Sequence, residues 1–446
     1  MLHRRSFIGQ LASLAFTQTI VSTQSASHAR ANLDEAEELD WKRFSYEDQN
    51  EVTVRLPPGR FIISETLVPT TKHFKLFGDK SGSTELINAT PGKPLIALGV
   101  GGRLHDSITI SNVKLCGSES SCIQCGTDSC RAERHKEFAN LMGRELYAGI
   151  LVANTEHVQI EDCIFETLNC GVVGVGWSGR KDINFGRLSI RRSSFSNCDF
   201  GVLIQQFSHC EIIGISGSNT AKRSFHHPHL IYTTDRSAAP IQKLHIARVK
   251  DSSNVHSSSI KVRNVKRAYL DSIDLDRCSR GLDFNWVDEA DLRNLRFTNP
   301  ASVETTLRTV LDVRECNRLT ATNCEATIGK NLIIANSRDD GKTEILNSIS
   351  FKNWHVQNIG RSDINGMLRL SDTKHVSIDG MVINVAECIK KINIFRGLNT
   401  AININIKESY INSPCTETSK PLLQVILPEE TNFVANLERL ERFQLE

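Results

Sequence analysis

A short unit of alternating β-branched and polar residues, ended by a polar bend, repeats along most of this chain. Between equivalent apolar positions, residue numbers differ by 24 from Ile246 to Leu270, by 22 from Leu270 to Leu292 and by 27 from Leu292 to Leu319. A repeat in this range marks a solenoid, in which each unit packs only on its neighbours. Clear copies of the unit are Val158–Phe165, Leu188–Phe195, Leu244–Val249, Leu270–Leu275 and Val376–Ile383.

The residue types within each unit favour strands over helices. Ile, Val, Thr and Asn dominate the runs, and long helical patterns are missing from them. Short strands joined by polar bends predict a parallel β-helix, because strands of neighbouring coils then pair in parallel about 4.8 Å apart and stack equivalent side chains in rows. Inward residues fill a dry core, and outward residues form a flat sheet face.

The amino-terminal part carries motifs of a known fold. The segments 54–63 (VRLPPGRFII), 74–79 (FKLFGD) and 83–87 (STELI), with Leu67 between them, resemble the first coils of pectate-lyase-like right-handed β-helix proteins. The resemblance implies an all-β fold, a single right-handed parallel β-helix over residues 50–412. Its motifs specify the fold rather than an activity.

Both ends of a solenoid need caps. Residues 32–49, which are charged and include Trp41 and Phe44, are predicted to form an N-terminal arm or cap. Residues 413–446 are predicted to form a C-terminal extension, and the pattern from Glu429 to Leu445 predicts a short helix within it.

The first 31 residues resemble a twin-arginine export signal, with Arg4, Arg5 and Phe7 at the matching positions and a small-residue cleavage site near Ala31. A general secretory signal is the alternative, and either places the mature chain in the periplasm or outside a bacterial cell. No segment of the mature chain reaches the ~20 apolar residues of a membrane-spanning helix. The net charge of +2 includes Arg4, Arg5 and Arg30, so removal of the signal leaves 2 − 3 = −1. This charge predicts no nucleic-acid partner.

Four of the 13 cysteines are clustered at C-x5-C-x2-C-x4-C inside a predicted loop insertion, residues 115–145. In an exported chain two disulfides are the plainer interpretation, and a tetrahedral zinc site is the rarer alternative. The other nine lie mostly at apolar positions or bends and are predicted to be small buried residues. The clustered cysteines are Cys116, Cys122, Cys125 and Cys130.

Residues 226–312 hold the strongest signal for chemistry. If Ile260 and Val262 point inward, Lys261 and Arg263 share the outer face. The same reasoning places Asp283, Asn285 and Asp312 on this face one or two coils later, although a register slip of one residue would invert the prediction. His226, His227 and His229 lie one coil earlier, close to Tyr232 and Arg236.

This set of residues fits an acidic-polysaccharide site. Abstraction of the proton beside a uronate carboxylate needs a base, a cation for the carboxylate and an acid for the leaving oxygen. The 259–263 and 281–284 segments are similar to chondroitinase B-like alginate lyases, and His227–His229 distantly resembles a motif of mannuronan epimerases. We therefore expect a polysaccharide lyase or uronate epimerase. Its base is Lys261, His227 or His229, its carboxylate-binding group is Arg263 or Arg236, and its acid is Tyr232; His226, Asp283, Asn285 and Asp312 bind substrate.

Other interpretations stay open at this point. Asp283 and Asp312 can serve a glycoside hydrolase, which needs two carboxylates beside the scissile bond. The chain can also be a non-catalytic glycan-binding or surface β-helix, with its charged row an ordinary surface ion ladder. Calcium is a candidate cofactor, and the oligomeric state is not assigned.

Overall fold

The computed structural model describes the greater part of the chain between residues 36 and 445. The described ranges are 36–90, 93–117, 148–176, 182–218, 229–233, 238–252, 258–278, 280–298, 309–328, 333–335, 346–358, 364–371, 373–385, 391–398, 403–407, 410–412, 422–426, 433–435 and 443–445. Except for Ala36, these residues belong to one of two compact units, Glu37–Glu446. The export signal expected in residues 1–31 lies outside the described residues.

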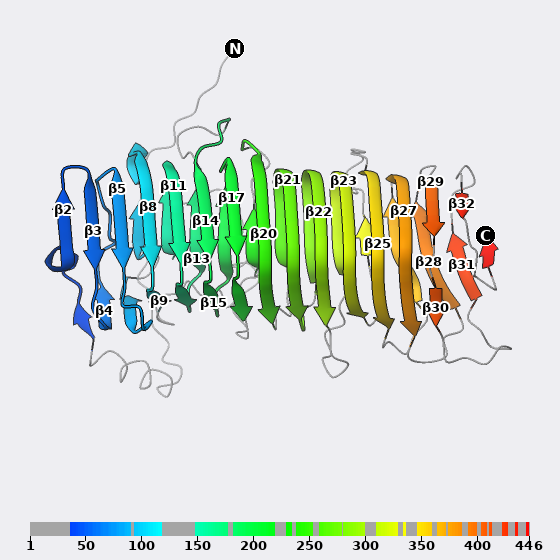
Figure 1. Ribbon diagram of the computed structural model, residues 1–446, viewed down its shortest axis with the longest axis horizontal. Coiled ribbons are helices and arrows are strands. Elements are labelled where there is room, and N and C mark those ends of the chain that lie inside the picture. The colour runs from blue at the N-terminus through cyan, green and yellow to red at the C-terminus, as the bar shows by residue number, and fades with distance from the viewer. Residues whose placement is uncertain are drawn as a thin grey trace, which may run out of the picture. The chain divides into compact units, whose positions relative to one another are not determined.

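The strands of this unit stack in successive coils and pair almost entirely in parallel (Figure 1). One ladder runs along the side toward the viewer in Figure 1. It comprises β3 (Glu51–Arg55), β5 (His73–Phe77), β8 (His105–Ser111), β11 (Thr155–Glu161), β14 (Arg187–Arg191), β17 (His209–Ile213), β20 (Ile241–Ser252), β21 (Ser258–Asp276), β22 (Arg280–Thr298), β23 (Thr309–Ile328), β25 (Leu346–Asn358), β27 (Thr373–Val385), β29 (Asn403–Lys407) and β32 (Phe433–Ala435). We call it the front ladder.

Further ladders complete the coils. The second comprises β1 (Glu37–Glu38), β4 (Gly59–Ile63), β6 (Thr84–Asn88), β9 (Lys114–Gly117), β12 (Ile164–Glu166), β15 (Ser194–Ser196), β18 (Ser216–Ser218), the ends of the long strands from β20 to β27, and β30 (Tyr410–Asn412). The third, the site ladder, comprises β7 (Ile96–Leu98), β10 (Ala148–Ala153), β13 (Cys170–Val175), β16 (Phe200–Gln205), β19 (His229–Thr233), the starts of β21, β22 and β23, then β24 (Ile333–Ala335), β26 (Ile364–Ser371), β28 (Lys391–Leu398), β31 (Leu422–Ile426) and β33 (Phe443–Leu445).

This pairing makes the unit an all-β solenoid of mostly parallel strands, which is compatible with the predicted β-helix. Inward side chains stack coil upon coil into one apolar core, as the alternation predicts. In the second ladder, for example, the buried rings of Phe165 and Phe195 stack with centroids 4.8 Å apart and planes inclined by 5°. One predicted equivalence is wrong: Leu292 pairs with Ala321, a difference of 29 residues, and Leu319 pairs with Ala290. The two-residue error leaves the facing unchanged, because side chains alternate with period two.

Asparagines occupy the bend between the front and second ladders in three successive coils. Asn294, Asn323 and Asn353 adopt left-handed backbone conformations, with φ of 53°, 57° and 54°. Asn tolerates this conformation better than most residues. Their side-chain amides also form a ladder, since Asn323 Nδ2 donates to Asn294 Oδ1 at 3.3 Å and Asn353 Nδ2 donates to Asn323 Oδ1 at 3.1 Å.

Residues 36–49 pack at the N-terminal end of the coils. The 3₁₀ turn η1 (Trp41–Phe44) places Trp41 and Phe44 against the apolar core, and β2 (Ser45–Asp48) pairs antiparallel with β3. Phe44 meets Phe61 edge to face, with ring centroids 5.9 Å apart. The only other helical turn among the described residues is η2 (Val100–Gly102), and no helix in the described part of the chain is long and apolar enough to cross a membrane.

The helix predicted over residues 429–445 is wrong for the part that the structure describes. Phe433–Ala435 and Phe443–Leu445 are the strands β32 and β33, which pair in parallel with β29 and β31. The exposed strand edge of the preceding coil offers backbone hydrogen bonds that override a local helical pattern. Coil pairing thus continues to Leu445 instead of stopping at residue 412.

Candidate functional site

Four polar residues from consecutive coils form a row on the outer side of the site ladder. Tyr232 in β19 pairs with Lys261 in β21, Lys261 with Asp283 in β22, and Asp283 with Asp312 in β23. Between them, Ile260, Val262, Leu282 and Phe284 are buried in the core, as the alternation predicts. The predicted facing and register are therefore confirmed for Lys261, Asp283 and Asp312. We call Tyr232, Lys261, Arg263, Asp283, Asn285, Asp312 and Arg314 the charged cluster.

The centre of the charged cluster is an ion pair with little solvent access. Lys261 Nζ lies 2.9 Å from Asp283 Oδ2, and the side chains are 17% and 6% exposed. Burial by itself raises the pKa of Asp283. The attraction and hydrogen bond of Lys261, with smaller contributions from Arg263 and Arg314, outweigh it and hold the pKa below its usual value of 3.8. Asp283 is thus a carboxylate at neutral pH.

Arginines occupy a parallel row beside the pair. Arg263 pairs with Asn285 and Asn285 with Arg314 in the strand register. Arg314 binds Asp312 with two hydrogen bonds, Nε to Oδ1 at 3.1 Å and Nη2 to Oδ2 at 2.7 Å. Sequence reasoning missed Arg314, although Asp312-Val-Arg314 repeats the spacing of Lys261-Val-Arg263 and could have indicated it.

Arg263 connects this row to Tyr232. Its Nη1 donates a hydrogen bond to the Tyr232 hydroxyl oxygen at 3.1 Å, and its guanidinium carbon lies 5.7 Å from the ring centroids of both Tyr232 and Trp286. Lys261 Nζ lies 5.9 Å from the Tyr232 ring centroid. Two cations therefore lie close to one phenol.

Several buried polar atoms in the charged cluster have no hydrogen-bond partner among the described residues. They are Arg263 Nε, Asp283 Oδ1 and Asn285 Oδ1. Buried polar groups in folded proteins are nearly always satisfied, so a group of unsatisfied donors and acceptors at one place indicates a binding position for water or a polar ligand.

Of the predicted histidines, the structure describes His229. It is 3% exposed, and its Nδ1 lies 2.5 Å from the carbonyl oxygen of Ser258. Its ring forms a three-ring cluster with Phe200 and Tyr232, at centroid distances of 5.9 Å and 5.1 Å. His229 is therefore placed to position Tyr232 rather than to meet a polymer directly. The predicted site residues His226, His227 and Arg236 lie outside the described residues.

The site ladder becomes apolar on its outer side before Tyr232. Ala97, Leu151, Val173 and Leu203 occupy successive strands there, all buried and in a cluster separate from the core. Sequence reasoning missed this row. Its signal is the continuous apolar character of 148–153, 170–175 and 200–204, which is typical of strands buried on both faces. A buried apolar row thus adjoins the charged cluster.

The cysteine prediction is corrected at its first member. Cys116 is a free, buried thiol whose Sγ donates to Glu85 Oε1 at 3.1 Å. Burial, together with Glu85, raises its thiol pKa. Cys122, Cys125 and Cys130 lie outside the described residues, as do Cys388 and Cys415. The described cysteines of the coils are all buried, which confirms their predicted role as small buried residues. Within the described residues no His, Cys, Asp or Glu group is gathered for a metal ion.

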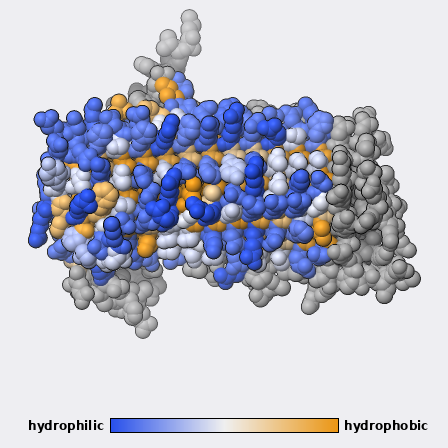
Figure 2. Space-filling view, in the orientation of Figure 1, coloured by the Kyte–Doolittle hydropathy of each residue, from blue (hydrophilic) through white to orange (hydrophobic). Residues whose placement is uncertain are grey.

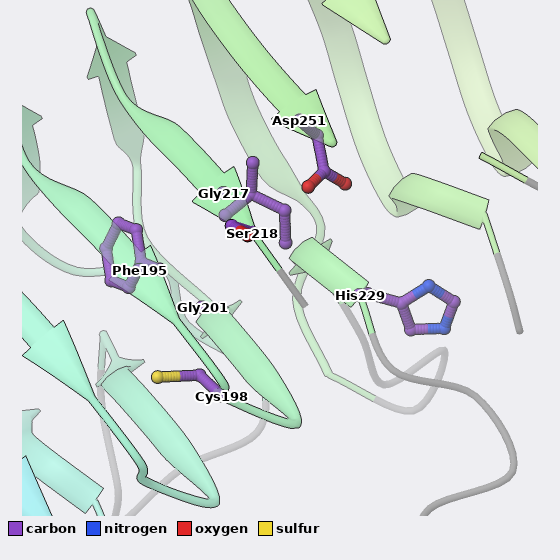
Figure 3. Close-up of a pocket in the computed structure, with 8 residues that line it drawn as sticks. Phe195, Cys198, Gly201, Gly217, Ser218, His229 and Asp251 are labelled. Carbon is purple, nitrogen blue, oxygen red and sulfur yellow. The ribbon is translucent and has the colours of Figure 1, made fainter. Parts of the chain in front are cut away.

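A small cavity lies inside the coils near Asp251, whose side chain replaces an apolar one in the row of Phe195 and Gly217 (Figure 3). Its volume of about 10 Å³ admits at most one water molecule. Figure 3 shows the Cys198 sulfur and the His229 ring well apart on opposite sides, so they form no nucleophile and base pair. The cavity is too small for a sugar and is not a candidate active site.

No protein-family model, curated protein sequence or solved structure matches this chain. Function is therefore argued from the chemistry of the charged cluster.

Proposed function

We propose that this protein is an exported, right-handed parallel β-helix that acts on an acidic polysaccharide, as a lyase or uronate epimerase, at the charged cluster. The observation that carries the proposal is the contact of Arg263 with the Tyr232 hydroxyl beside the Lys261–Asp283 pair, where buried polar atoms lack partners. Cations and a proton-transfer group thus lie together on one sheet face.

The charge of the cluster suits a uronate. Lys261, Arg263 and Arg314 oppose Asp283 and Asp312, which gives 3 − 2 = +1. A bound carboxylate would neutralise the remaining charge and could accept a hydrogen bond from Arg263 Nε. Neutralising the carboxylate makes the neighbouring C–H more acidic, because the negative charge that develops on deprotonation is stabilised.

Proton transfer can be assigned to two groups of the row. In this proposal Tyr232 enters the step as a phenolate, its own proton having passed to solvent, and its oxygen, held by Arg263, takes the proton beside the uronate carboxylate. This exchanges the roles expected from the sequence, because Lys261 is paired with Asp283 and so holds a proton that it can donate. In a lyase the C–H electron pair forms the new C=C bond, the glycosidic C–O bond breaks, and Lys261, a donor to Asp283 in the structure, gives a proton to the leaving oxygen. In an epimerase the C–O bond stays intact and a proton returns to the opposite face of the same carbon.

The hydrolase interpretation receives less support. An inverting or retaining hydrolase needs one protonated carboxyl group as its general acid. Asp283 has a lowered pKa, and Asp312 is bound to Arg314 by two hydrogen bonds. Both are placed to hold cations rather than to donate a proton.

Two readouts on the purified mature protein test the proposal. Alginate, pectate, chondroitin, hyaluronan and a bacterial exopolysaccharide are incubated in heavy water with and without calcium. Ultraviolet absorbance then follows unsaturated uronate, and NMR follows deuterium entry beside the carboxylate. We expect one polymer to give absorbance, for a lyase, or deuterium without absorbance, for an epimerase. Saturable binding without either signal would overturn catalysis and identify a glycan-binding β-helix.

A further inference from the structure

A second polar surface lies on the front ladder. A groove of about 540 Å³ crosses β8, β11, β14, β17 and β20. The charged cluster lies on other strands and begins with Tyr232 in β19. Figure 2 shows that the face turned to the viewer, which carries the front ladder, is largely hydrophilic, with narrow apolar bands. The groove takes no residue from the charged cluster.

One row of this groove is basic over consecutive coils. His157 pairs with Arg187, Arg187 with His209, and His209 with Lys243. In parallel pairing these positions repeat about every 4.8 Å along the coil axis. His157, Arg187 and Lys243 are exposed. The row therefore presents positive or ionisable groups at a regular spacing.

Two members of this row, Arg187 and Lys243, are not neutralised by acidic neighbours in the described part of the chain, whereas His157 Nε2 lies 3.8 Å from Glu156 Oε1. The groove has a single carboxylate, Glu211, which Arg191 and Ser189 contact. Among the described residues no carboxylate lies within 4.0 Å of Arg187 or Lys243, and His209 Nδ1 is buried without a hydrogen-bond partner. Arg187, Arg191 and Lys243 against Glu211 give 3 − 1 = +2 with neutral histidines.

The cations of the same row are ion-paired where the row leaves the groove. Lys243 is followed by Arg267, Glu289 and Arg318 in the strand register. Glu289 lies 3.8 Å from Arg267 Nε and 3.0 Å from Arg318 Nη2. The unpaired cations are thus confined to the groove, which a uniformly charged surface would not explain.

The remaining lining suits sugars better than bases. Thr109, Gln159 and Ser189 supply hydroxyl and amide groups beside the basic row. No Trp, Tyr or Phe lines the groove, whereas proteins that bind single-stranded nucleic acids use aromatic side chains to stack bases. An acidic polysaccharide carries carboxylates at a regular spacing with hydroxyls between them. Its carboxylates match the basic row, and its hydroxyls match the polar row of Thr109, Gln159 and Ser189.

We propose that this groove binds a segment of acidic polysaccharide laid along the coil axis, with its carboxylates on Arg187, His209 and Lys243. The groove is a second binding surface that holds the polymer while another segment reaches the charged cluster. It shares its ligand class with the proposed function but requires no reaction at Lys261.

The test compares two double variants of equal charge change. Arg187→Gln with Lys243→Gln alters the groove, and Arg267→Gln with Arg318→Gln alters the paired part of the same row. Calorimetry with oligogalacturonate and oligomannuronate of defined length should show about a tenfold or greater loss of affinity in the first variant, because charge-assisted contacts are lost, and less than about twofold in the second. Equal losses of affinity in the two double variants, or no loss of affinity in the groove variant, would overturn the proposal.

Further measurements separate other ligands and folding defects. If inorganic phosphate or single-stranded DNA binds the groove as tightly as the oligouronates do, the assignment of the groove to polysaccharide is overturned. In the unaltered protein, bound oligouronate should protect Lys243 from acetylation and leave Lys266 reactive; no protection would count against the groove even if the variants misfold. Turnover of a trisaccharide should be unchanged in the groove variant, so failure here is distinct from failure of catalysis at Tyr232.

Discussion

Lys261 Nζ lies 2.9 Å from Asp283 Oδ2, and five residues later in the same two strands Lys266 Nζ lies 2.8 Å from Asp288 Oδ2. The first pair is 17% and 6% exposed, and the second is 48% and 52% exposed. Two chemically identical pairs thus differ mainly in burial, which makes one the natural control for the other.

Removal of the lysines should separate the two environments. Lys261→Ala is expected to lower the free energy of unfolding by about 2–4 kcal/mol, because it leaves the buried Asp283 carboxylate with only Arg263 and Arg314 nearby. Lys266→Ala should cost about 0–1 kcal/mol, as exposed pairs do. Denaturant unfolding followed by circular dichroism measures both. Equal losses of unfolding free energy in the two variants would show that burial does not make the Lys261–Asp283 pair more important for stability than the exposed pair.

Stability should depend on the protonation of Asp283. The folded-state pKa of Asp283 lies below 3.8, so its contribution is present above that value and is lost as pH falls through the folded pKa. Asp283→Asn is therefore expected to lose less stability than the unaltered protein between about pH 5 and about pH 2. Thermal unfolding across this range measures the difference, and parallel curves would contradict the shift.

Tyr232→Phe should preserve the fold and impair the reaction. The ring contacts remain, while the oxygen that accepts a hydrogen bond from Arg263 is lost. Turnover should fall by roughly 10²–10⁴, the usual contribution of a positioned proton-transfer group. Tyr269→Phe is the control, because Tyr269 lies on the front ladder beside His245 and Arg293. Similar rates in both variants would remove Tyr232 from the mechanism.

Thiol titration should distinguish buried from accessible cysteines. Eight of the 13 cysteines are buried in the described part of the chain, so at most 13 − 8 = 5 should react with a thiol reagent in the native protein. Cys116 should stay unreactive, since burial and Glu85 raise its thiol pKa. Mass spectrometry of the labelled peptides identifies the sites. Rapid labelling of Cys116 would contradict its placement.

The sequence by itself determined the facing of the site strands. The apolar residues Ile260 and Val262 were expected to point inward together, which places Lys261 and Arg263 outward, because successive side chains of a strand alternate between its faces. Alternation is set within a few residues of one strand, so it can be predicted from the sequence without knowing which strands lie beside it. The asparagines at the bends are local signals of the same kind.

Tertiary structure decided which residues of different coils meet. The pairing of Leu292 with Ala321, the burial of His229 and the pairing of Arg314 with Asn285 depend on loop lengths and on the path of each coil. The groove across β8, β11, β14, β17 and β20 likewise arises from five coils that stack in register. The C-terminal strands show the same limit, since β32 and β33 form where an earlier coil supplies hydrogen-bond partners. Alternation is a property of one strand, whereas register is a property of the stack.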